Sequence, residues 1–374
     1  RQDYDKGILS IMGMKPKMLV LINSSTGLYD FRNELLSELS KSYCIVVSTP
    51  DSGKIDLIKK LGCEVIITSI DRRGINPVVD LKLINNYRKI INKEKPDYIL
   101  TYTIKPNIYG GFLARVKKIN YAVNITGLGT TFQKDGLLQS IVTKMYRIAF
   151  KKANVVFFEN IENKNIIVSK KIVPDSRCCV LNGAGVNLDR YSYLEYPVDC
   201  KKTRFLFIGR VMREKGFDEL YTAMQRLIDE GFDCKLDVLG SYEEDYKEKI
   251  DSAVEAGWLS YYGYRNDVRP FIEKSHCFVL PSWHEGMANT NLECASSGRP
   301  VITSNIHGCK EAVLDGTTGY LCESQNINSL YECMKKFIAL SYQKRKDMGK
   351  AGRKHMENVF DKRIIVDSTI KNLK

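Results

Sequence analysis

Two glutamates stand eight residues apart in the stretch HEGMANTNLE, which runs from His284 to Glu293. Only uncharged residues lie between Glu285 and Glu293, and a glycine follows the first glutamate. A carboxylate accepts hydrogen bonds from paired hydroxyl groups such as those of sugars and riboses. The pair therefore points to an elongated ligand that has hydroxyl groups at both ends.

A second stretch, GRVMREKG, supplies two cations, Arg210 and Lys215. An arginine and a lysine together can hold a diphosphate, the first through its planar fork and the second as a mobile point charge. Backbone amides near Met287 to Asn289 could receive a phosphate as well, if a helix starts there. Taken alone, each of these residues is equally compatible with a structural role, because charged residues are common in loops.

The elements that would position these motifs follow from an alternation of apolar runs and helical patterns. The first half holds the apolar runs KMLVLIN, YCIVVST, EVIITSI, DYILTYT, YAVNIT and NVVFFEN, and the second half holds RFLFIGR, KLDVLGS, HCFVLPS and RPVITSN. Amphipathic segments such as LYDFRNELLSELSKS and NPVVDLKLINNYRKIINKEK separate them. Apolar strands that alternate with amphipathic helices indicate parallel sheets covered on both faces. We predict an α/β chain of two Rossmann-like domains whose parallel sheets face a central cleft.

The domain boundary is expected where the periodicity breaks and turn residues gather, between residues 183 and 203. We predict an N-terminal domain over residues 14–185 and a C-terminal domain over residues 186–352. Residues 353–374 are expected to form a last helix that packs back toward the N-terminal domain. Residues 1–13 lack this periodicity, and we expect them to be a loose extension or a remnant foreign to the fold.

Both motifs fall at the carboxyl ends of predicted strands, where ligands of such folds bind. GRVMREKG follows RFLFI, and the glutamate stretch follows HCFVLPS. We expect Asn289 or Thr290 to cap a helix that runs to about Ser297, with Glu285 in the loop before it and Glu293 one turn inside it. The spacing then suits a nucleotide sugar, which has hydroxyl groups at both ends and a diphosphate between them.

The positive charge of the chain lies entirely in its first half. Residues 1–186 hold 29 basic and 16 acidic residues, whereas residues 187–374 hold 28 of each. Such a one-sided field favours an anionic partner for the first half: nucleic acid, an anionic membrane surface or a phosphorylated substrate. The alternative is a surface that is basic for solubility only.

Cysteine and histidine usage argues against disulfides and against a metal site. The eleven cysteines are scattered through apolar segments without a CxxC motif, which indicates buried thiols in a reducing compartment. The four histidines are not at metal-ligand spacing. No apolar run approaches the roughly 20 residues that span a bilayer, and no signal-peptide pattern is present. We expect a cytoplasmic protein without a bound cofactor and without a histidine–cysteine metal site.

At this point the sequence resembles a known family. GRVMREKG, EGMANTNLE, GCKEAV and DGTTGYL together are similar to the motifs of the retaining glycosyltransferases of family 4, which have the GT-B fold. The resemblance implies transfer of a sugar from a nucleotide diphosphate sugar, with retained configuration and without a bound catalytic metal. It implies that Arg210 and Lys215 bind the donor diphosphate, that Glu285 contacts hydroxyl groups of the donor sugar, and that Glu293 contacts the ribose. Arg210, Lys215 and Glu285 are the residues that it assigns to catalysis.

The same resemblance implies a wider donor site, in which Gly240 and the loop YGYRND line the nucleotide base. Gly27 would lie near the donor phosphates. The remaining donor-side residues are Gly209, Gly240, Tyr264, Asp267, Gly286, Met287, Ala288, Asn289 and Thr290.

Two further stretches, STGLYDFR and NITGLGTTF, resemble the bacterial members that build polyprenyl-diphosphate-linked oligosaccharides. They place Tyr29, Arg32, Thr126 and Gly127 on the acceptor side. Many members of the family have an active-site histidine in the N-terminal domain, but this chain has none before His276. The role of that N-terminal histidine is then absent or taken over by backbone groups near Thr126 and Gly127.

Residues 136–154 have apolar side chains at helical spacing beside Lys144, Arg147, Lys151 and Lys152. This segment could touch an anionic membrane on its cytoplasmic face. The alternative is an ordinary domain helix with a solvated basic edge.

The function that combines these observations is transfer of a sugar, expected to be an N-acetylhexosamine from a UDP-sugar, to a lipid-diphosphate-linked saccharide. A soluble acceptor is the first alternative, and a basic nucleic-acid-binding or non-catalytic nucleotide-binding protein is the second. A dinucleotide-dependent oxidoreductase would need GxGxxG after the first strand, where SSTGLYD stands instead. A metal-dependent transferase would need a DxD motif, for which the sequence offers only Asp3 with Asp5.

Overall fold

A computed structural model describes residues 15–71, 76–128, 132, 136–198 and 202–373 of the chain. The predicted extension over residues 1–13 lies outside these residues. The chain divides into two compact units, which are described separately: unit 1 comprises residues 1–184 and 365–374, and unit 2 comprises residues 185–364.

Unit 1 is built on a seven-stranded sheet in the order β3-β2-β1-β4-β5-β6-β7, with every strand pair parallel. Its strands are β1 (Lys17–Leu21), β2 (Cys44–Thr49), β3 (Glu64–Ile67), β4 (Tyr98–Tyr102), β5 (Asn120–Ile125), β6 (Val155–Phe158) and β7 (Cys178–Val180). Its helices are α2 (Ser25–Ser40), α3 (Ile55–Lys60), α4 (Pro77–Glu94), the π-helix η1 (Pro106–Gly110), α5 (Gly111–Val116), α6 (Leu137–Ala149), α7 (Ile161–Ser169), the 3₁₀ turn η3 (Asp175–Arg177) and α14 (Lys362–Leu373).

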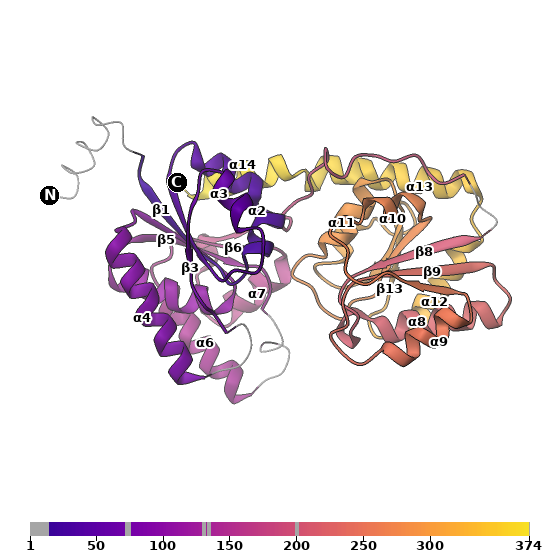
Figure 1. Cartoon of the computed structure of the whole chain (residues 1–374), viewed down its shortest axis with the longest axis horizontal. Coiled ribbons are helices and arrows are strands. Elements are labelled where there is room, and N and C mark those ends of the chain that lie inside the picture. Colours follow the sequence, from indigo (N-terminus) through magenta and orange to yellow (C-terminus); the bar gives the residue numbers. More distant parts are fainter. Residues whose placement is uncertain (1–14, 72–75, 129–131, 133–135, 199–201, 374) are drawn as a thin grey trace. The chain divides into compact units, whose positions relative to one another are not determined.

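Two separate apolar cores cover the two faces of this sheet, as its alternating side chains require. Apolar side chains of α4, α5 and α6 pack with Leu19 and Leu21 on one face. Side chains of α2, α3 and α14 pack with Met18 and Val20 on the other face. The two groups of helices lie on opposite sides of the sheet in Figure 1.

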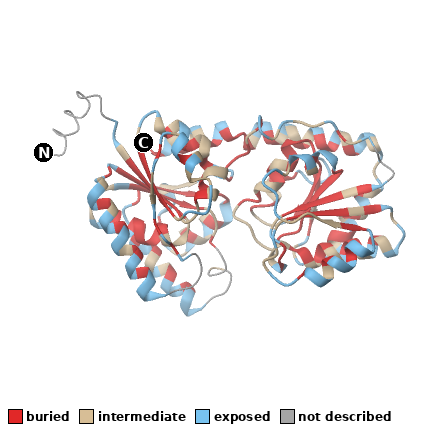
Figure 2. Cartoon of the chain, viewed as in Figure 1, coloured by how far each residue is buried: buried red, intermediate tan, exposed pale blue. Residues whose placement is uncertain are grey.

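Unit 2 has a six-stranded parallel sheet in the order β10-β9-β8-β11-β12-β13. Its strands are β8 (Thr203–Ile208), β9 (Cys234–Leu239), β10 (Leu259–Tyr261), β11 (Cys277–Leu280), β12 (Val301–Ser304) and β13 (Gly319–Cys322). Its helices are α8 (Phe217–Asp229), α9 (Lys247–Glu255), α10 (Arg269–Lys274), α11 (Asn289–Ser296), α12 (Ile327–Ile338), α13 (Tyr342–His355) and the π-helix η6 (Met356–Phe360), with 3₁₀ turns η4 (Arg213–Lys215) and η5 (Lys310–Ala312). The strands of both units are largely buried (Figure 2), which explains why they read as continuous apolar runs.

The predicted class of two parallel α/β sheets is confirmed. The end of the chain differs from the prediction, because no helix boundary occurs at Gly352. Helix α13 continues through Gly349 and Gly352 to His355, and the last helix, α14, begins at Lys362. Part of α14, with Ile365 and Leu373, belongs to the core of unit 1.

The cysteines are mostly buried, as predicted, and those that the structure describes are free thiols. Cys44, at the start of β2, is exposed and departs from that prediction. Burial raises the pKa of the Cys63 thiol to about 11, which keeps that thiol protonated near neutral pH.

Candidate active site

The loops that follow β8 and β11 hold the three residues predicted to be catalytic. These two strands are neighbours at the point where the strand order of unit 2 reverses, so the chain leaves them in opposite directions. Such a switch point leaves a crevice at the carboxyl ends of the strands, where ligands of open α/β sheets bind. Arg210 and Lys215 follow β8, and Glu285 follows β11.

Lys215 and Glu285 form an ion pair across this switch point. The Lys215 ammonium nitrogen is 2.5 Å from Glu285 Oε1, and the Ser282 hydroxyl donates a hydrogen bond of 2.8 Å to the same oxygen. Both charged side chains are mostly buried, with 20% and 12% of their surface exposed. An ammonium has three N–H donors, so Lys215 can keep Glu285 and still bind a phosphate oxygen.

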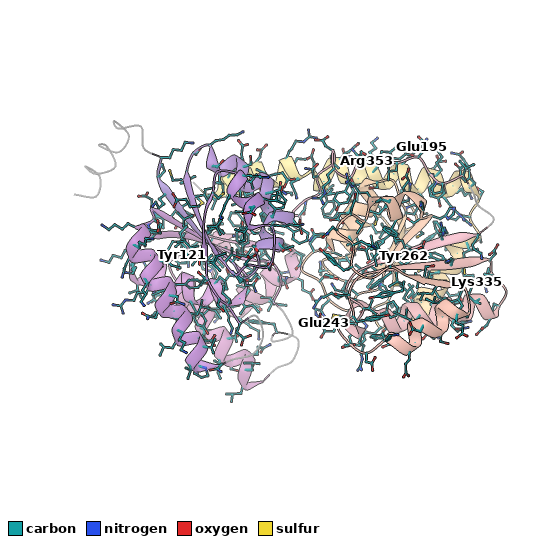
Figure 3. The ribbon with its side chains drawn as sticks, viewed as in Figure 1. Tyr121, Glu195, Glu243, Tyr262, Lys335 and Arg353 are labelled. Carbon is teal, nitrogen blue, oxygen red and sulfur yellow. The ribbon has the colours of Figure 1, made fainter. Side chains whose placement is uncertain are left out.

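Arg210 is held more loosely than Lys215. Its guanidinium lies 3.7 Å from Glu243 Oε1, and about half of the side chain is exposed. Glu243, labelled in Figure 3, follows β9 rather than β11. The structure therefore brings Lys215 and Glu285 into contact. Arg210 is not part of this pair and makes a longer contact with Glu243.

Gly209 and Gly240 meet where the loops after β8 and β9 cross. The Gly209 amide donates to the Leu239 carbonyl at 2.9 Å, and Gly240 has a φ of 139°. A Cβ at position 240 would lie 1.8 Å from the Gly209 carbonyl oxygen. A glycine is therefore required at 240 for the approach of the two loops, whatever its part in binding a nucleotide base.

Glu293 lies on α11 and is hydrogen bonded to the Tyr191 hydroxyl. Burial and, secondly, the negative charge of Glu293 raise the pKa of Tyr191 above its ordinary value, so the hydroxyl stays protonated and donates. The Tyr191 carbonyl in turn accepts hydrogen bonds from Ser296 and from Arg353. Sequence reasoning missed Tyr191, since nothing in its local sequence shows that it meets α11.

The start of α11 differs from the prediction. Neither Asn289 nor Thr290 is the N-cap: both lie inside the helix, and Ala288 occupies the capping position without a side-chain hydrogen bond. The Ala288 amide, predicted to be available to phosphate, donates to the Gly308 carbonyl at 2.7 Å. The Met287 and Ala288 side chains are buried in the core of unit 2. Packing of this turn against Gly308, which the local sequence does not reveal, sets where the helix begins.

The Glu311 carboxylate stabilises the segment around Gly308, against which the start of α11 packs. Glu311 accepts a hydrogen bond of 2.8 Å from the Gly308 amide and lies 2.7 Å from His307 Nδ1. A Cβ on Gly308 would approach the carbonyl oxygens of Glu285 and Gly286 to 2.7 Å. The segment around Gly308 therefore packs closely against the loop that contains Glu285. The hydrogen bond from the Gly308 amide to Glu311 stabilises this arrangement.

The loop predicted to line the base presents Tyr264 with 63% of its surface exposed. The Asp267 carboxylate is engaged by Arg269, with two side-chain contacts of 2.8 Å. These hydrogen bonds lower the pKa of Asp267 from its ordinary value. Tyr242 and Tyr261 stack with ring centroids 4.7 Å apart, and the Tyr261 hydroxyl donates to the Gly240 carbonyl.

In unit 1, Gly27 and Tyr29 lie at the start of α2, directly after β1. Ser24 caps this helix by accepting a hydrogen bond of 3.1 Å from the Gly27 amide. The Lys54 ammonium lies 5.9 Å from the centre of the Tyr29 ring. Strand β1 adjoins β4 at the switch point of this sheet, so the start of α2 occupies the equivalent position in unit 1.

Arg32 is buried, and its guanidinium lies 2.7 Å from Glu159 Oε1 and over the ring of Tyr102. Its predicted contact with an acceptor remains a prediction, because this ion pair gives the side chain a structural role of its own. Thr126 and Gly127 follow β5 and are half-buried.

A further feature of unit 1 was not predicted. Thr103, directly after β4, has a φ of 70°, which is rare for a β-branched residue. Such backbone strain concentrates at functional sites. The π-helix η1 begins three residues later, and the side-chain amide of its Asn107 donates to the Asn124 carbonyl at 2.8 Å. The ends of β4 and β5 are therefore tied together beside Thr103.

Comparison with known proteins assigns both units. Residues 195–355 match the family model described as glycosyl transferases group 1, and residues 17–160 match the model described as glycosyl transferase 4-like. The chain is a glycosyltransferase. Among its curated relatives is the N,N'-diacetylbacillosaminyl-diphospho-undecaprenol alpha-1,3-N-acetylgalactosaminyltransferase of Campylobacter jejuni, 25% identical over 94% of this chain and 99% of that protein. Another is the UDP-Gal:alpha-D-GlcNAc-diphosphoundecaprenol alpha-1,3-galactosyltransferase of Escherichia coli, 26% identical over 70% of this chain and 71% of that protein.

Solved structures confirm the GT-B fold of this glycosyltransferase. A glycosyltransferase from Rickettsia africae matches with a TM-score of 0.78 and 18% identity, over 96% of this chain and 98% of that chain. HepE from Anabaena, in complex with UDP and glucose, matches with a TM-score of 0.79 and 15% identity, over 96% and 99% of the two chains.

The described part of the glycosyltransferase contains neither a candidate metal site nor a candidate membrane-spanning helix. No group of three or more His, Cys, Asp or Glu residues within it could hold a metal ion. None of its described helices is both long enough and apolar enough to cross a membrane. The expectation of metal-independent transfer remains a prediction.

Proposed function

We propose that this glycosyltransferase moves an N-acetylhexosamine from a UDP-sugar to a saccharide linked to a lipid diphosphate, with retained anomeric configuration and without a metal. The observation that supports the donor half of this proposal is the contact between Lys215 and Glu285 at the switch point of unit 2. It places a cation and a hydroxyl-binding carboxylate side by side, as the junction between a sugar and a diphosphate requires.

The names of the relatives support the acceptor half. The Campylobacter relative is named for an acceptor linked to diphospho-undecaprenol, and the Escherichia relative for one linked to diphosphoundecaprenol. They differ in the sugar that they transfer, which is N-acetylgalactosamine in one and galactose in the other. We therefore propose the lipid diphosphate acceptor as the shared property and the N-acetylhexosamine as the choice that needs testing.

In the proposed reaction, the bond between the anomeric carbon and the diphosphate oxygen breaks while a bond to the acceptor oxygen forms. The acceptor hydroxyl gives its proton to the departing diphosphate. Lys215 and Arg210 neutralise the charge that grows on the leaving group, and Glu285 accepts hydrogen bonds from hydroxyl groups of the donor sugar. Glu293, with Tyr191 donating to it, accepts hydrogen bonds from the ribose. Preorganised charges of this kind lower the barrier because they need no reorganisation during the reaction.

A matrix of donors and acceptors tests the proposal. The purified enzyme is incubated with UDP-GalNAc, UDP-GlcNAc, UDP-Gal or UDP-Glc, each with a polyprenyl-diphosphate saccharide or with the same saccharide free, and products are identified by mass spectrometry. We expect an extended lipid-linked saccharide with one UDP-N-acetylhexosamine, in equal yield with EDTA present. Extension of the free saccharide at the same rate would favour a soluble acceptor, and loss of activity in EDTA would contradict the metal-free reaction.

A lipid-linked acceptor implies work at a membrane, and we propose the cytoplasmic face. Lys144, Arg147, Lys151 and Lys152, the basic residues predicted to meet an anionic membrane, are all exposed on α6 and the turn after it. That exposure is compatible with membrane contact and also with a solvated helix edge.

A further inference from the structure

Helices α4, α5 and α6 cover one face of the unit 1 sheet and expose an unusual number of large apolar side chains. Nine of the nineteen exposed large hydrophobic side chains of the described chain lie on these three helices: Val78, Val79, Leu81, Phe112, Val116, Leu137, Leu138, Ile141 and Ile148. Helices α2, α3 and α14 on the opposite face expose two, Phe31 and Ile364. A clustering of this kind on one layer marks an interaction surface, whereas single exposed apolar residues are ordinary.

The same layer is basic and lacks exposed acidic groups. Its three helices contain two acidic residues, Asp80 and Glu94. Asp80 is buried beside Lys105, and the side chain of Glu94 is 10% exposed and paired with Lys17. The exposed charges of these helices are therefore all positive: Lys82, Arg88, Lys89, Lys93, Lys144 and Arg147.

In α4 and α6 the most exposed apolar side chains lie toward the start of each helix, and Ile148 is the exception near the end of α6. In α4 the apolar residues Val78 and Leu81 lie in the first five positions, and in α6 Leu137, Leu138 and Ile141 do so. The basic residues follow in the later turns. Leu81 and Leu137 expose 67% and 79% of their surface.

The sheet topology puts these two apolar ends at the same edge. Helix α4 connects β3 to β4 and helix α6 connects β5 to β6, all parallel strands of one sheet. Each helix must then run back against the strands and begin near their carboxyl ends. The apolar edge of the layer is therefore the edge at which ligands of such a sheet bind.

We infer that the α4–α5–α6 face docks on an anionic lipid bilayer, with its apolar edge inserted and its basic part on the headgroups. This inference rests on the proposed function in one respect: the inserted edge is the one at which a lipid-linked acceptor would reach unit 1. Nucleic acid would satisfy the charges but leave the apolar edge in water. A second copy of the same face would bring like charges together, which disfavours self-association.

Vesicle flotation with matched variants tests the inference. Vesicles of phosphatidylcholine, with or without phosphatidylglycerol, are compared for the parent protein, an apolar-edge variant (Leu81→Ser, Leu137→Ser, Leu138→Ser, Ile141→Ser) and a basic variant (Lys144→Gln, Arg147→Gln, Lys151→Gln, Lys152→Gln). A control variant, Lys344→Gln with Lys350→Gln and Lys354→Gln, removes exposed charges from α13, a helix without exposed large apolar side chains.

We expect the parent to float only with phosphatidylglycerol present. A basic residue near an anionic surface contributes about 1 kcal/mol, roughly fivefold in partitioning, so the loss of four such residues should weaken binding of the basic variant by about 600-fold. The apolar-edge variant should lose binding that persists in high salt, and the control should bind like the parent. The four residues of the basic variant belong to neither the donor site nor the acceptor side, so its transfer to a detergent-solubilised acceptor should stay unchanged.

The outcomes separate this inference from the proposed function. An active enzyme that does not float, or that floats equally well in both variants, overturns the docking face and leaves the transfer reaction standing. Flotation as expected without any sugar transfer supports the face and contradicts the function. DNA binding that is lost in the basic variant alone, or a dimer that dissociates in the apolar-edge variant, without vesicle binding, replaces the bilayer with another partner.

Discussion

At the scale of single residues, the contact between Lys215 and Glu285 joins positions 70 residues apart. The two charges come from loops after adjacent strands, so the sheet itself fixes their separation. Replacing Lys215 would leave the mostly buried Glu285 carboxylate without its cation and, in the proposed reaction, would remove a positive charge that faces the leaving diphosphate. The pair is therefore the part of the site most sensitive to substitution.

Lys215→Ala and Arg210→Ala should each lower kcat by about 10² to 10³, as expected for the loss of one preorganised contact to developing charge. Initial rates at saturating donor provide the measurement. Arg213→Ala is the matched control, because Arg213 is an exposed cation in the same turn. A Lys215→Ala enzyme within threefold of the parent would refute the assignment.

We expect Glu311 to affect the reaction through the loop of Glu285, because Glu311 accepts a hydrogen bond from the Gly308 amide, which packs against that loop. Glu311→Ala removes an acceptor from the Gly308 amide and from His307, an effect of about 1–3 kcal/mol for a hydrogen-bonding group left unpaired. An effect of this size should lower kcat/KM for the donor about tenfold or more in Glu311→Ala. Glu311→Gln should retain most of the kcat/KM of the parent. Equal activity of Glu311→Ala and a neighbouring Lys310→Ala would remove the positioning role.

At the scale of elements, the apolar runs located the central strands and the edge strand β3 correctly, whereas the other three edge strands were not predicted. Strands β7, β10 and β13 have three or four residues and lie at sheet edges. An edge strand is covered on fewer sides, and β7 and β10 are half-buried and only three residues long, CCV and LSY. Their pairing depends on a neighbour far along the chain.

Helix ends were also set by contacts that local sequence does not show. A Cβ at Gly349 would lie 2.1 Å from the Gly298 carbonyl oxygen. Gly349 therefore stands inside α13 because two backbones meet there, although glycines near the end of a helical pattern suggest a stop. At α11, the Gly308 contact to Ala288 displaced the start that Asn289 or Thr290 predicted.

The crossing of the loops after β8 and β9 gives a direct test at this scale. Gly240→Ala places a methyl group against the Gly209 carbonyl and should lower the free energy of unfolding by at least ~2 kcal/mol. Gly231→Ala is the control, because Gly231 has a φ of 82° and open space around its Cα. Chemical denaturation would give both values. Similar losses for the two variants would mean that backbone conformation, not the loop crossing, determines the cost.

At the scale of the whole molecule, the last ten residues of the chain belong to unit 1, although the residues directly before them belong to unit 2. Helix α14 supplies Ile365 and Leu373 to the core of unit 1, although residues 185–364 form unit 2. No local pattern says which core an amphipathic helix joins.

Deletion of residues 365–374 should therefore destabilise unit 1 selectively, by uncovering apolar side chains of β1, β2 and α2. Amide hydrogen exchange followed by mass spectrometry would show faster exchange in β1 and β2 and unchanged exchange in β8 and β11. Lys371→Ala, a surface change on the same helix, should alter neither. Equal loss of protection in both units would contradict the division into separate cores.

We propose above all that unit 2 binds a nucleotide diphosphate sugar at Lys215 and Glu285. The most direct measurement is release of UDP from UDP-N-acetylhexosamine by the parent and by Lys215→Ala, with and without a polyprenyl-diphosphate saccharide. We expect UDP release that requires the lipid-linked acceptor, persists in EDTA and falls about a hundredfold or more in the variant. Release that ignores the acceptor, or that survives the loss of Lys215, would contradict this proposal.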